Sequence, residues 1–353
     1  MQDLKVTIIQ PDVLWEDVNS NLSSYTEKID SISEQTDLII LPETFTTGFS
    51  MNMRKCSEQM NGKTIKWMKD QSRKTNAVVM GSIFVKEVDR FYNRLIWVEP
   101  NGIFHYYDKR HLFRMSNEHL YVKQGDRRLI VTLNGWKIYP LICYDLRFPI
   151  WSTNKYSKTH ENYSYDCLIY IANWPEKRDE AWETLLKARA IENQAYTIGV
   201  NRIGIDGNNF SYCGNSMVVN YKGKTISALE KNEEKISSIT LNYEELEDYR
   251  RHFDVAKDWD KFKLLKFGKE ISENDAIISE IAHSKKEKPN KTFEFIKKHK
   301  GKFLVALVFI IIFLLYIFIF RFDNSPNAVK FKESDKFIKE QDKRIRAVNP
   351  YEK

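Results

Sequence analysis

Residues 141–149 read Leu141-Ile142-Cys143-Tyr144-Asp145-Leu146-Arg147-Phe148-Pro149. The apolar run before them, residues 136–140, is typical of a buried strand, and residues 148–152 favour the start of a helix. Cys143 is therefore expected where a strand turns sharply. Unpaired N–H groups and the partial positive charge of a helix N-terminus favour a thiolate, the form of cysteine that attacks carbonyl carbon. Taken alone, the pattern also fits a buried structural cysteine.

Two other predicted strands end at charged residues. Residues 37–41 form an apolar run that stops just before Glu43, and residues 103–107 follow a hairpin turn and end just before Lys109. Open α/β sheets build their sites at the carboxyl edge of the strands. Each residue alone also fits a solvated surface position. Together with Cys143 they place an acid, a cation and a nucleophile at one edge.

Strands and helices alternate along the chain, and hairpins interrupt the alternation. This pattern predicts an α/β fold with mixed sheets, in which two sheets stack between helical layers. The further strands are expected at residues 5–10, 77–85, 91–98, 129–133, 167–172, 196–200, 216–219 and 235–241, and the helices at 19–33, 64–75 and 181–194.

Composition excludes several classes of protein. The chain has 353 residues and a net charge of +7, but no basic stripe with interleaved aromatic residues, so we expect no nucleic-acid partner. Four cysteines, none at metal-ligand spacing, argue against a disulfide framework and favour a reducing compartment. The first ten residues are strand-like and lack the apolar core of a secretory signal.

Several ordered motifs resemble the carbon–nitrogen hydrolase (nitrilase) superfamily. They are LPETFTTGF around Glu43, YDKRHLFRMSNEH around Lys109, LICYDLRFP around Cys143, and the later runs YIANWPEKR, ARAIENQAY and NRIGIDGN. Within the superfamily the chain looks like the ω-amidase branch, which acts on 2-oxoglutaramate and 2-oxosuccinamate. The resemblance implies a four-layer αββα sandwich over residues 1–262, and a homodimer.

The resemblance also implies roles for individual residues. Glu43 is expected to be the general base, Lys109 to support the tetrahedral intermediate and Cys143 to be the nucleophile, with Glu118 as the second glutamate of the site. The chemistry agrees, because amide hydrolysis needs a nucleophile, a proton carrier and an oxyanion donor. Lys109 and the backbone N–H of Tyr144 could supply the last. Only water is needed as a co-substrate, so we expect no metal or organic cofactor.

Substrate selection requires a further cation. The amide of a 2-oxo acid carries a carboxylate far from the bond that is cleaved, so the pocket must bind a negative charge. Arg178 follows Asn173 and Trp174 closely, and we expect it to bind this carboxylate, with Trp174 as an apolar wall. Arg147 is the rival, although its place beside Cys143 favours a structural ion pair.

The chain continues beyond the predicted hydrolase domain. Residues 263–302 form a lysine-rich linker, residues 303–320 are apolar without a charge, and residues 321–353 form a charged tail. Eighteen apolar residues are about long enough to cross a bilayer, so we expect a single transmembrane helix at 303–320. Lysines are denser before this segment than after it, which predicts a cytoplasmic catalytic domain.

Two alternatives to an ω-amidase remain open. The chain could be another carbon–nitrogen hydrolase, acting on a nitrile, a carbamoyl compound or a lipid-linked amide. It could also be a catalytically idle domain that serves as a membrane-tethered binding module. The presence of Glu43, Lys109 and Cys143 together counts against the second, because the fold does not require them.

Overall fold

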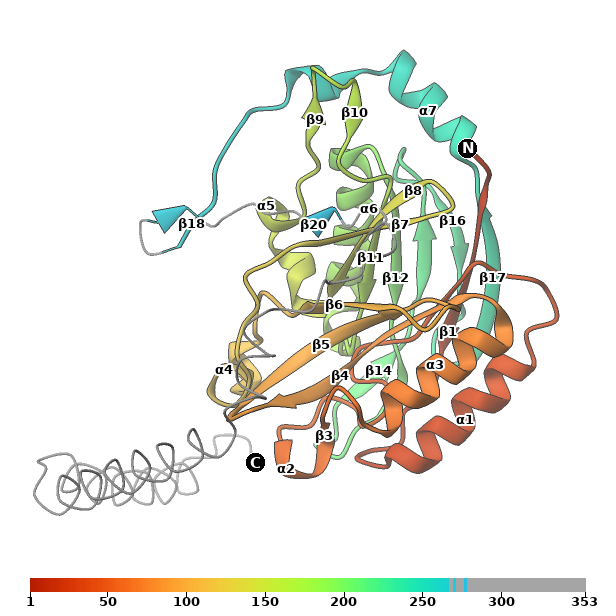
Figure 1. Ribbon diagram of the computed structural model, residues 1–353, viewed down its shortest axis with the longest axis vertical. Helices are drawn as coiled ribbons and strands as arrows, with labels where there is room; N and C mark the ends of the chain where they lie inside the picture. The colour runs from red at the N-terminus through yellow and green to blue at the C-terminus, as the bar shows by residue number, and fades with distance from the viewer. Residues whose placement is uncertain (267–268, 271–275, 278–353) are drawn as a thin grey trace, which may run out of the picture. The chain divides into compact units, whose positions relative to one another are not determined.

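The computed structural model describes residues 1–266, 269–270 and 276–277, which belong to one compact unit, Met1–Ile281. Two mixed β-sheets stack in this unit, as predicted (Figure 1). In order across the first sheet, the strands are β17 (Lys235–Leu241), β1 (Leu4–Gln10), β2 (Leu38–Ile40), β4 (Val78–Glu87), β5 (Arg90–Val98) and β6 (Phe104–Asp108), with β3 (Ser57–Glu58) pairing with β4. In the second sheet they are β16 (Thr225–Ala228), β15 (Met217–Val219), β12 (Tyr196–Val200), β11 (Cys167–Ile171), β8 (Trp136–Ile142), β7 (Leu129–Leu133) and β20 (Ala276–Ile277).

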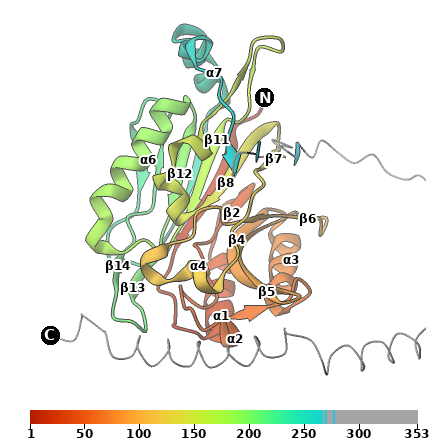
Figure 2. The same cartoon turned by 90° about the vertical axis from the view of Figure 1, so that its left-hand side faces the viewer.

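Helices cover the outer face of each sheet. Figure 2 shows α6 (Asp179–Asn193) outside the second sheet, and α3 (Lys63–Thr75) with α1 (Val18–Asp30) outside the first. The layers therefore follow the order αββα, which agrees with the predicted fold. Both sheets are covered on both faces, which explains why their central strands are almost continuously apolar.

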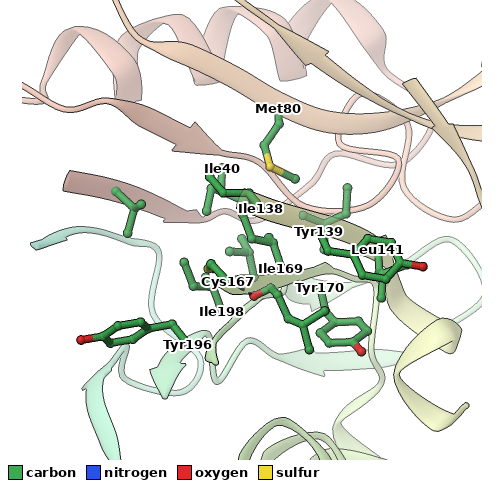
Figure 3. Packing of buried hydrophobic residues seen from close by; sticks show 14 of the residues in the cluster. Ile40, Met80, Ile138, Tyr139, Leu141, Cys167, Ile169, Tyr170, Tyr196 and Ile198 are labelled. Carbon is green, nitrogen blue, oxygen red and sulfur yellow. Dashed lines mark hydrogen bonds between the residues drawn. The ribbon is translucent and has the colours of Figure 1, made fainter. Parts of the chain in front are cut away.

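The main core lies between the two sheets and beneath α6. Ile40 and Met80 of the first sheet lie over Ile138 of the second (Figure 3). On the far side of the second sheet, the contact with α6 requires a glycine. A Cβ at Gly199 in β12 would lie 2.4 Å from Leu186 Cδ1 and 2.6 Å from Trp182 Cζ2, so a larger residue there would force these two α6 side chains to move. A second core fills the space between the first sheet and helices α1 and α3.

Strand directions explain how the candidate residues meet. β2 pairs parallel with β4, β4 antiparallel with β5 and β5 antiparallel with β6, so β6 runs parallel to β2. Glu43 and Lys109, which follow β2 and β6, thus leave the first sheet at the same edge. β8 and β11 are also parallel, and the residues that follow them, Cys143 and Asn173, leave the second sheet at one edge.

Some elements differ from the expectation. The sequence predicts no helix at residues 243–252, where the structure has α7 (Tyr243–His252). It also predicts a polar loop around Glu118, where the structure has a 3₁₀ turn (Arg114–Ser116) followed by the short helix α4 (Glu118–Tyr121). Two short hairpins were also not predicted, because the periodicity of so few residues is uninformative. They pair β9 (Tyr156–Ser157) with β10 (Asn162–Tyr163), and β13 (Ile203–Ile205) with β14 (Ser211–Cys213).

The predicted transmembrane segment, residues 303–320, lies outside the described residues. Within residues 1–266, 269–270 and 276–277, no helix is both long and apolar enough to cross a bilayer. Of the linker predicted before the segment, the structure describes residues 263–266, 269–270 and 276–277. The rest of the linker and the predicted tail lie outside the described ranges. These domain boundaries therefore stay predictions.

Candidate active site

The carboxyl ends of strands from both sheets bring the three main candidates into one buried site. Glu43 follows β2, Lys109 follows β6 and Cys143 follows β8, and the Glu43 and Lys109 side chains are 0% and 1% exposed. The Cys143 residue is 9% exposed. Burial of an acid and a base without solvent requires that each be paired, because an isolated charge in this environment is strongly destabilising.

The Lys109 ammonium lies between two carboxylates. Its Nζ donates hydrogen bonds to Glu43 Oε1 at 2.8 Å and to Glu118 Oε2 at 3.0 Å. Burial alone lowers the pKa of Lys109, but the negative charges of Glu118 and Glu43 outweigh burial and raise that pKa well above its ordinary value. Lys109 therefore stays charged, and it places a fixed cation beside Cys143.

Glu118 is fully buried, in contrast to the polar loop expected around it. As the first residue of α4 it is 0% exposed, and its Oε2 accepts the backbone N–H of Phe113 at 2.6 Å. Burial raises the pKa of Glu118, although Lys109 opposes this shift. Glu118 thus forms the second ion pair of the Lys109 ammonium, and the role that the resemblance implies for Glu118 stays a prediction.

Glu43 is held by two asparagines as well as by Lys109. Asn93 Nδ2 donates to Glu43 Oε1 at 2.8 Å, and the backbone N–H of Asn173 donates to Glu43 Oε2 at 2.9 Å. Asn93 is not among the predicted site residues, because it lies inside strand β5 and not at a strand end. The available signal was a lone amide in an otherwise apolar and aromatic run, and Ser82 Oγ, at 2.9 Å from Asn93 Oδ1, fixes that amide.

Cys143 occupies a strained turn. Its φ is +42°, a region that residues other than glycine rarely adopt, and it begins a five-residue 3₁₀ helix, Cys143–Arg147. The Sγ atom lies 3.8 Å from the backbone oxygen of Asn173. This turn aims the sulfur away from the sheet and into the cluster of Glu43 and Lys109.

The surroundings of Cys143 do not favour the expected thiolate. Burial raises the pKa of the Cys143 thiol well above its ordinary value, the charge of Glu43 raises it further, and Lys109 only partly opposes them. The helix that follows is too short to supply the expected field. The expectation considered the cation and the helix end but not the desolvation and the neighbouring carboxylate. The proton must therefore leave the sulfur during the reaction.

The candidate substrate-binding residues lie around this cluster. Asn173 Nδ2 donates to the Glu43 backbone oxygen at 2.7 Å, so its side chain is committed to holding the base. The Tyr144 ring packs edge-on against Phe113 at 5.1 Å. Trp174 is buried, and its indole N–H donates to the backbone oxygen of Arg178 at 2.8 Å.

The two candidate arginines lie on different aromatic rings. The Arg147 guanidinium carbon is 4.9 Å from the centre of the Trp174 ring, and that of Arg178 is 5.3 Å from the centre of the Phe113 ring. Neither forms an ion pair with another residue in the described ranges, so the structural ion pair expected for Arg147 is not found there. Both guanidinium groups therefore remain candidates for a substrate carboxylate.

Comparison with known proteins identifies the family. The carbon–nitrogen hydrolase family matches this chain over residues 5–251. The chain belongs to the carbon–nitrogen hydrolase family. It is a hydrolase that acts on carbon–nitrogen bonds, as the motifs predict. Within residues 1–266, 269–270 and 276–277, no group of three His, Cys, Asp or Glu side chains is placed to hold a metal ion.

Individual relatives of this carbon–nitrogen hydrolase support the predicted branch. The ω-amidase YafV of Escherichia coli K12 is 41% identical over 264 residues, which cover 75% of this chain and 100% of the relative. The 2-oxoglutaramate amidase of Bacillus subtilis is 30% identical over 256 residues, covering 72% and 96%. A solved carbon–nitrogen hydrolase superfamily protein of Xanthomonas campestris, with an arsenic adduct in its active site, is 39% identical, with a TM-score of 0.73 and coverage of 75% and 100%.

Proposed function

We propose that this carbon–nitrogen hydrolase is an ω-amidase, which hydrolyses the terminal amide of 2-oxoglutaramate or 2-oxosuccinamate to the 2-oxo dicarboxylate and ammonia. The observation that carries the proposal is the buried arrangement of Glu43, Lys109 and Cys143 in a chain that is 41% identical to an ω-amidase over that relative's full length. The similarity to a 2-oxoglutaramate amidase supports the same class of substrate.

The first half of the reaction forms an acyl-enzyme. Glu43 takes the proton from the Cys143 thiol as the sulfur attacks the amide carbon, which is consistent with a thiol at rest. The amide oxygen becomes an oxyanion, which the Lys109 ammonium and the backbone N–H of Tyr144 stabilise. The C–N bond then breaks, the nitrogen takes the proton from Glu43, and ammonia leaves a thioester on Cys143.

The second half regenerates the enzyme. Glu43 takes a proton from a water molecule, the resulting hydroxide attacks the thioester carbon, and Lys109 again stabilises the oxyanion. The C–S bond breaks, and the proton held by Glu43 returns to Cys143 as the carboxylic acid product forms. Asn93 and Asn173 hold the carboxylate of Glu43 in one orientation for both proton transfers.

Arg178 is our first candidate for the distal carboxylate of the substrate. Its guanidinium lies over Phe113, whose ring contacts Tyr144 directly after the nucleophile. The Arg147 guanidinium lies over a different ring, that of Trp174. Arg178→Ala should raise KM for 2-oxoglutaramate more than tenfold, with a smaller change in kcat. If KM instead rises by that amount in Arg147→Ala and stays unchanged in Arg178→Ala, Arg147 binds the carboxylate.

The proposed activity is tested by ammonia release from 2-oxoglutaramate by the full chain, beside the Cys143→Ala variant. Release that disappears in the variant supports both the ω-amidase activity and the nucleophile. A folded wild-type protein that releases no ammonia from either 2-oxo amide contradicts the ω-amidase assignment, and assays with nitriles, carbamoyl compounds and lipid-linked amides then distinguish the other classes of carbon–nitrogen hydrolase.

We also propose that residues 303–320 anchor the protein in a membrane, with the catalytic domain on the cytoplasmic side. The support is the uncharged apolar run and the lysines that precede it. The protein should stay with membranes after alkaline carbonate washing, and deletion of residues 303–353 should release it. Recovery of the full chain in the wash would contradict the anchor.

The homodimer implied by the family resemblance remains a proposal as well. Sedimentation velocity of the protein in detergent should give twice the mass of one chain after correction for bound detergent. A single species with the mass of one chain at micromolar concentration would contradict it.

A further inference from the structure

The carboxylate of Asp145 is a buried junction between two loops of the active site. Its Oδ2 accepts hydrogen bonds from the Tyr107 hydroxyl at 2.8 Å and from the backbone N–H of Ile142 at 3.1 Å. Its Oδ1 accepts the backbone N–H of His111 at 2.9 Å and lies 2.8 Å from His111 Nδ1. The Asp145 side chain is 0% exposed, so these four groups are its whole hydrogen-bonding environment among the described residues.

The histidine in this network has a defined proton and a defined ring orientation. Because a carboxylate oxygen only accepts, His111 carries a proton on Nδ1 and donates it to Asp145. The ring stacks on Phe148 at a centroid distance of 3.8 Å with 7° between the planes, and it meets Trp151 edge-on at 6.2 Å. His111 therefore has little freedom to release the carboxylate.

The two loops that Asp145 joins carry the cation and the nucleophile. His111 lies two residues after Lys109, and Ile142 directly precedes Cys143. The positive φ of Cys143 is unfavourable for a residue with a side chain, so it persists only if the surroundings hold the turn. The Asp145 bond to Ile142 N–H holds that turn, and the Asp145 bonds to His111 fix the Lys109 loop against it.

We propose that His111 is a positioning residue for hydrolysis: its Nδ1–H locks the Asp145 carboxylate, so that the Lys109 ammonium and the Cys143 sulfur keep the spacing that the oxyanion requires. The inference rests on the proposed function in one respect, the role of Cys143 as the nucleophile. A shift of about 1 Å between reacting groups can lower a rate about 100-fold, so loss of this lock should affect turnover more than substrate binding.

The test compares two substitutions at His111 with a matched control, all in the full chain. His111→Ala removes the donor, whereas His111→Asn keeps an N–H near the position of Nδ1. His105→Ala is the control, because His105 is also a largely buried histidine next to a carboxylate, with its Nε2 3.3 Å from Glu99 Oε1, but it contacts neither active-site loop.

We expect kcat for ammonia release to fall about 10-fold to 100-fold in His111→Ala, with KM changed less than about threefold. His111→Asn should recover most of kcat, and His105→Ala should match the wild type. An unchanged kcat in folded His111→Ala overturns the proposal. So does a kcat in His111→Asn as low as that of His111→Ala, because a donor in the same place would then not matter.

A second measurement separates this inference from the proposed function. The rate of Cys143 alkylation by iodoacetamide, followed on the Cys143 peptide by mass spectrometry, needs no substrate. It should fall in His111→Ala and recover in His111→Asn, because proton transfer to Glu43 depends on the position of the sulfur. If the wild type hydrolyses no amide, the proposed function fails while the alkylation rates still decide the role of His111; equal rates in all variants would overturn that role.

Discussion

Two clusters in which one cation lies between two carboxylates meet at the end of strand β6. Lys109 lies between Glu43 and Glu118, and Arg94 lies between Asp108 and Glu87. Asp108 precedes Lys109 in the chain and pairs with Arg94 across the two strands. Two ion-pair clusters thus lie side by side, and their chemistry differs because their surroundings differ.

Solvent access separates the two clusters. Both acids that hold Lys109 are 0% exposed, whereas the side chains of Asp108 and Glu87 are 15% and 42% exposed. Arg94 also uses its planar fork fully, since Nε and Nη2 both bond to Asp108 and the group lies 4.0 Å from the Tyr106 ring centre. Arg94 therefore stabilises the sheet, whereas Lys109 provides a buried positive charge beside the Cys143 thiol.

The largest expected effect follows removal of the cation from the catalytic cluster. Lys109→Gln should lower kcat by on the order of 10²–10³, because an oxyanion donor is lost. It should also lower the free energy of unfolding by about 3–5 kcal/mol, because Glu43 and Glu118 are left as buried, uncompensated charges. Ammonia release and urea unfolding measure the two effects. Lys86→Gln, at an exposed lysine of β4, is the control; more than a tenth of wild-type kcat in Lys109→Gln would refute the oxyanion role.

A smaller loss is expected when one acid of that cluster is neutralised. Glu118→Gln keeps the shape and an oxygen for the Phe113 N–H, but weakens the hold on Lys109. We expect kcat to fall about tenfold, the equivalent of one charge-assisted hydrogen bond. Glu87→Gln, the corresponding change beside Arg94, should leave kcat unaltered. Equal activities for the two variants would remove the distinction between the clusters.

Arg94→Gln should affect stability without affecting turnover. The expected loss in the free energy of unfolding is about 1–3 kcal/mol, since Glu87 is partly solvated and Asp108 retains some access to water. Thermal or urea unfolding gives the stability, and kcat per folded molecule should equal that of the wild type. A tenfold drop in kcat at full folding would show that the second cluster also serves catalysis.

The smallest effect concerns pH and the Cys143 thiol. Its pKa is raised above the ordinary value of 9.0, so above pH 9 the unfolded chain loses this proton more readily than the folded one. Stability should therefore fall as pH rises above 9, by up to about 1.4 kcal/mol per pH unit for this group. In Cys143→Ala the decline between pH 9 and pH 10 should be shallower by about 1 kcal/mol, because the unfolded thiol is still half protonated at pH 9. Parallel curves for the two proteins would show that folding does not raise the pKa of this thiol.

The sequence predicted the part of the site that lies at strand ends. Glu43, Lys109 and Cys143 each follow a recognisable apolar run, so the strand periodicity and the turn residues were enough to place them at an edge. Glu118 came only from the family resemblance, because its own surroundings in the sequence are polar. Its burial depends on Lys109 and Phe113, which no local pattern reveals.

The parts that the sequence did not predict depend on contacts between distant segments. Asn93 lies inside a strand, and its role appears only when Glu43 is brought against it. Helix α7 is dense in charge, and Leu246 and Arg250 are its only buried residues, so its apolar stripe is too narrow to predict a helix. The pKa of the Cys143 thiol depends on both burial and the charges nearby, and the spacing of residues along the chain reveals neither.

The base and the nucleophile follow strands of different sheets: Glu43 and Lys109 follow strands of the first sheet, and Cys143 and Asn173 follow strands of the second. Asn173 donates hydrogen bonds from the second sheet to Glu43, the base. A slight slide of one sheet over the other would separate sulfur from base while every strand kept its own ladder. Catalytic activity thus reports on the packing of the two sheets. On gentle heating, the activity should be lost before circular dichroism detects any loss of β structure.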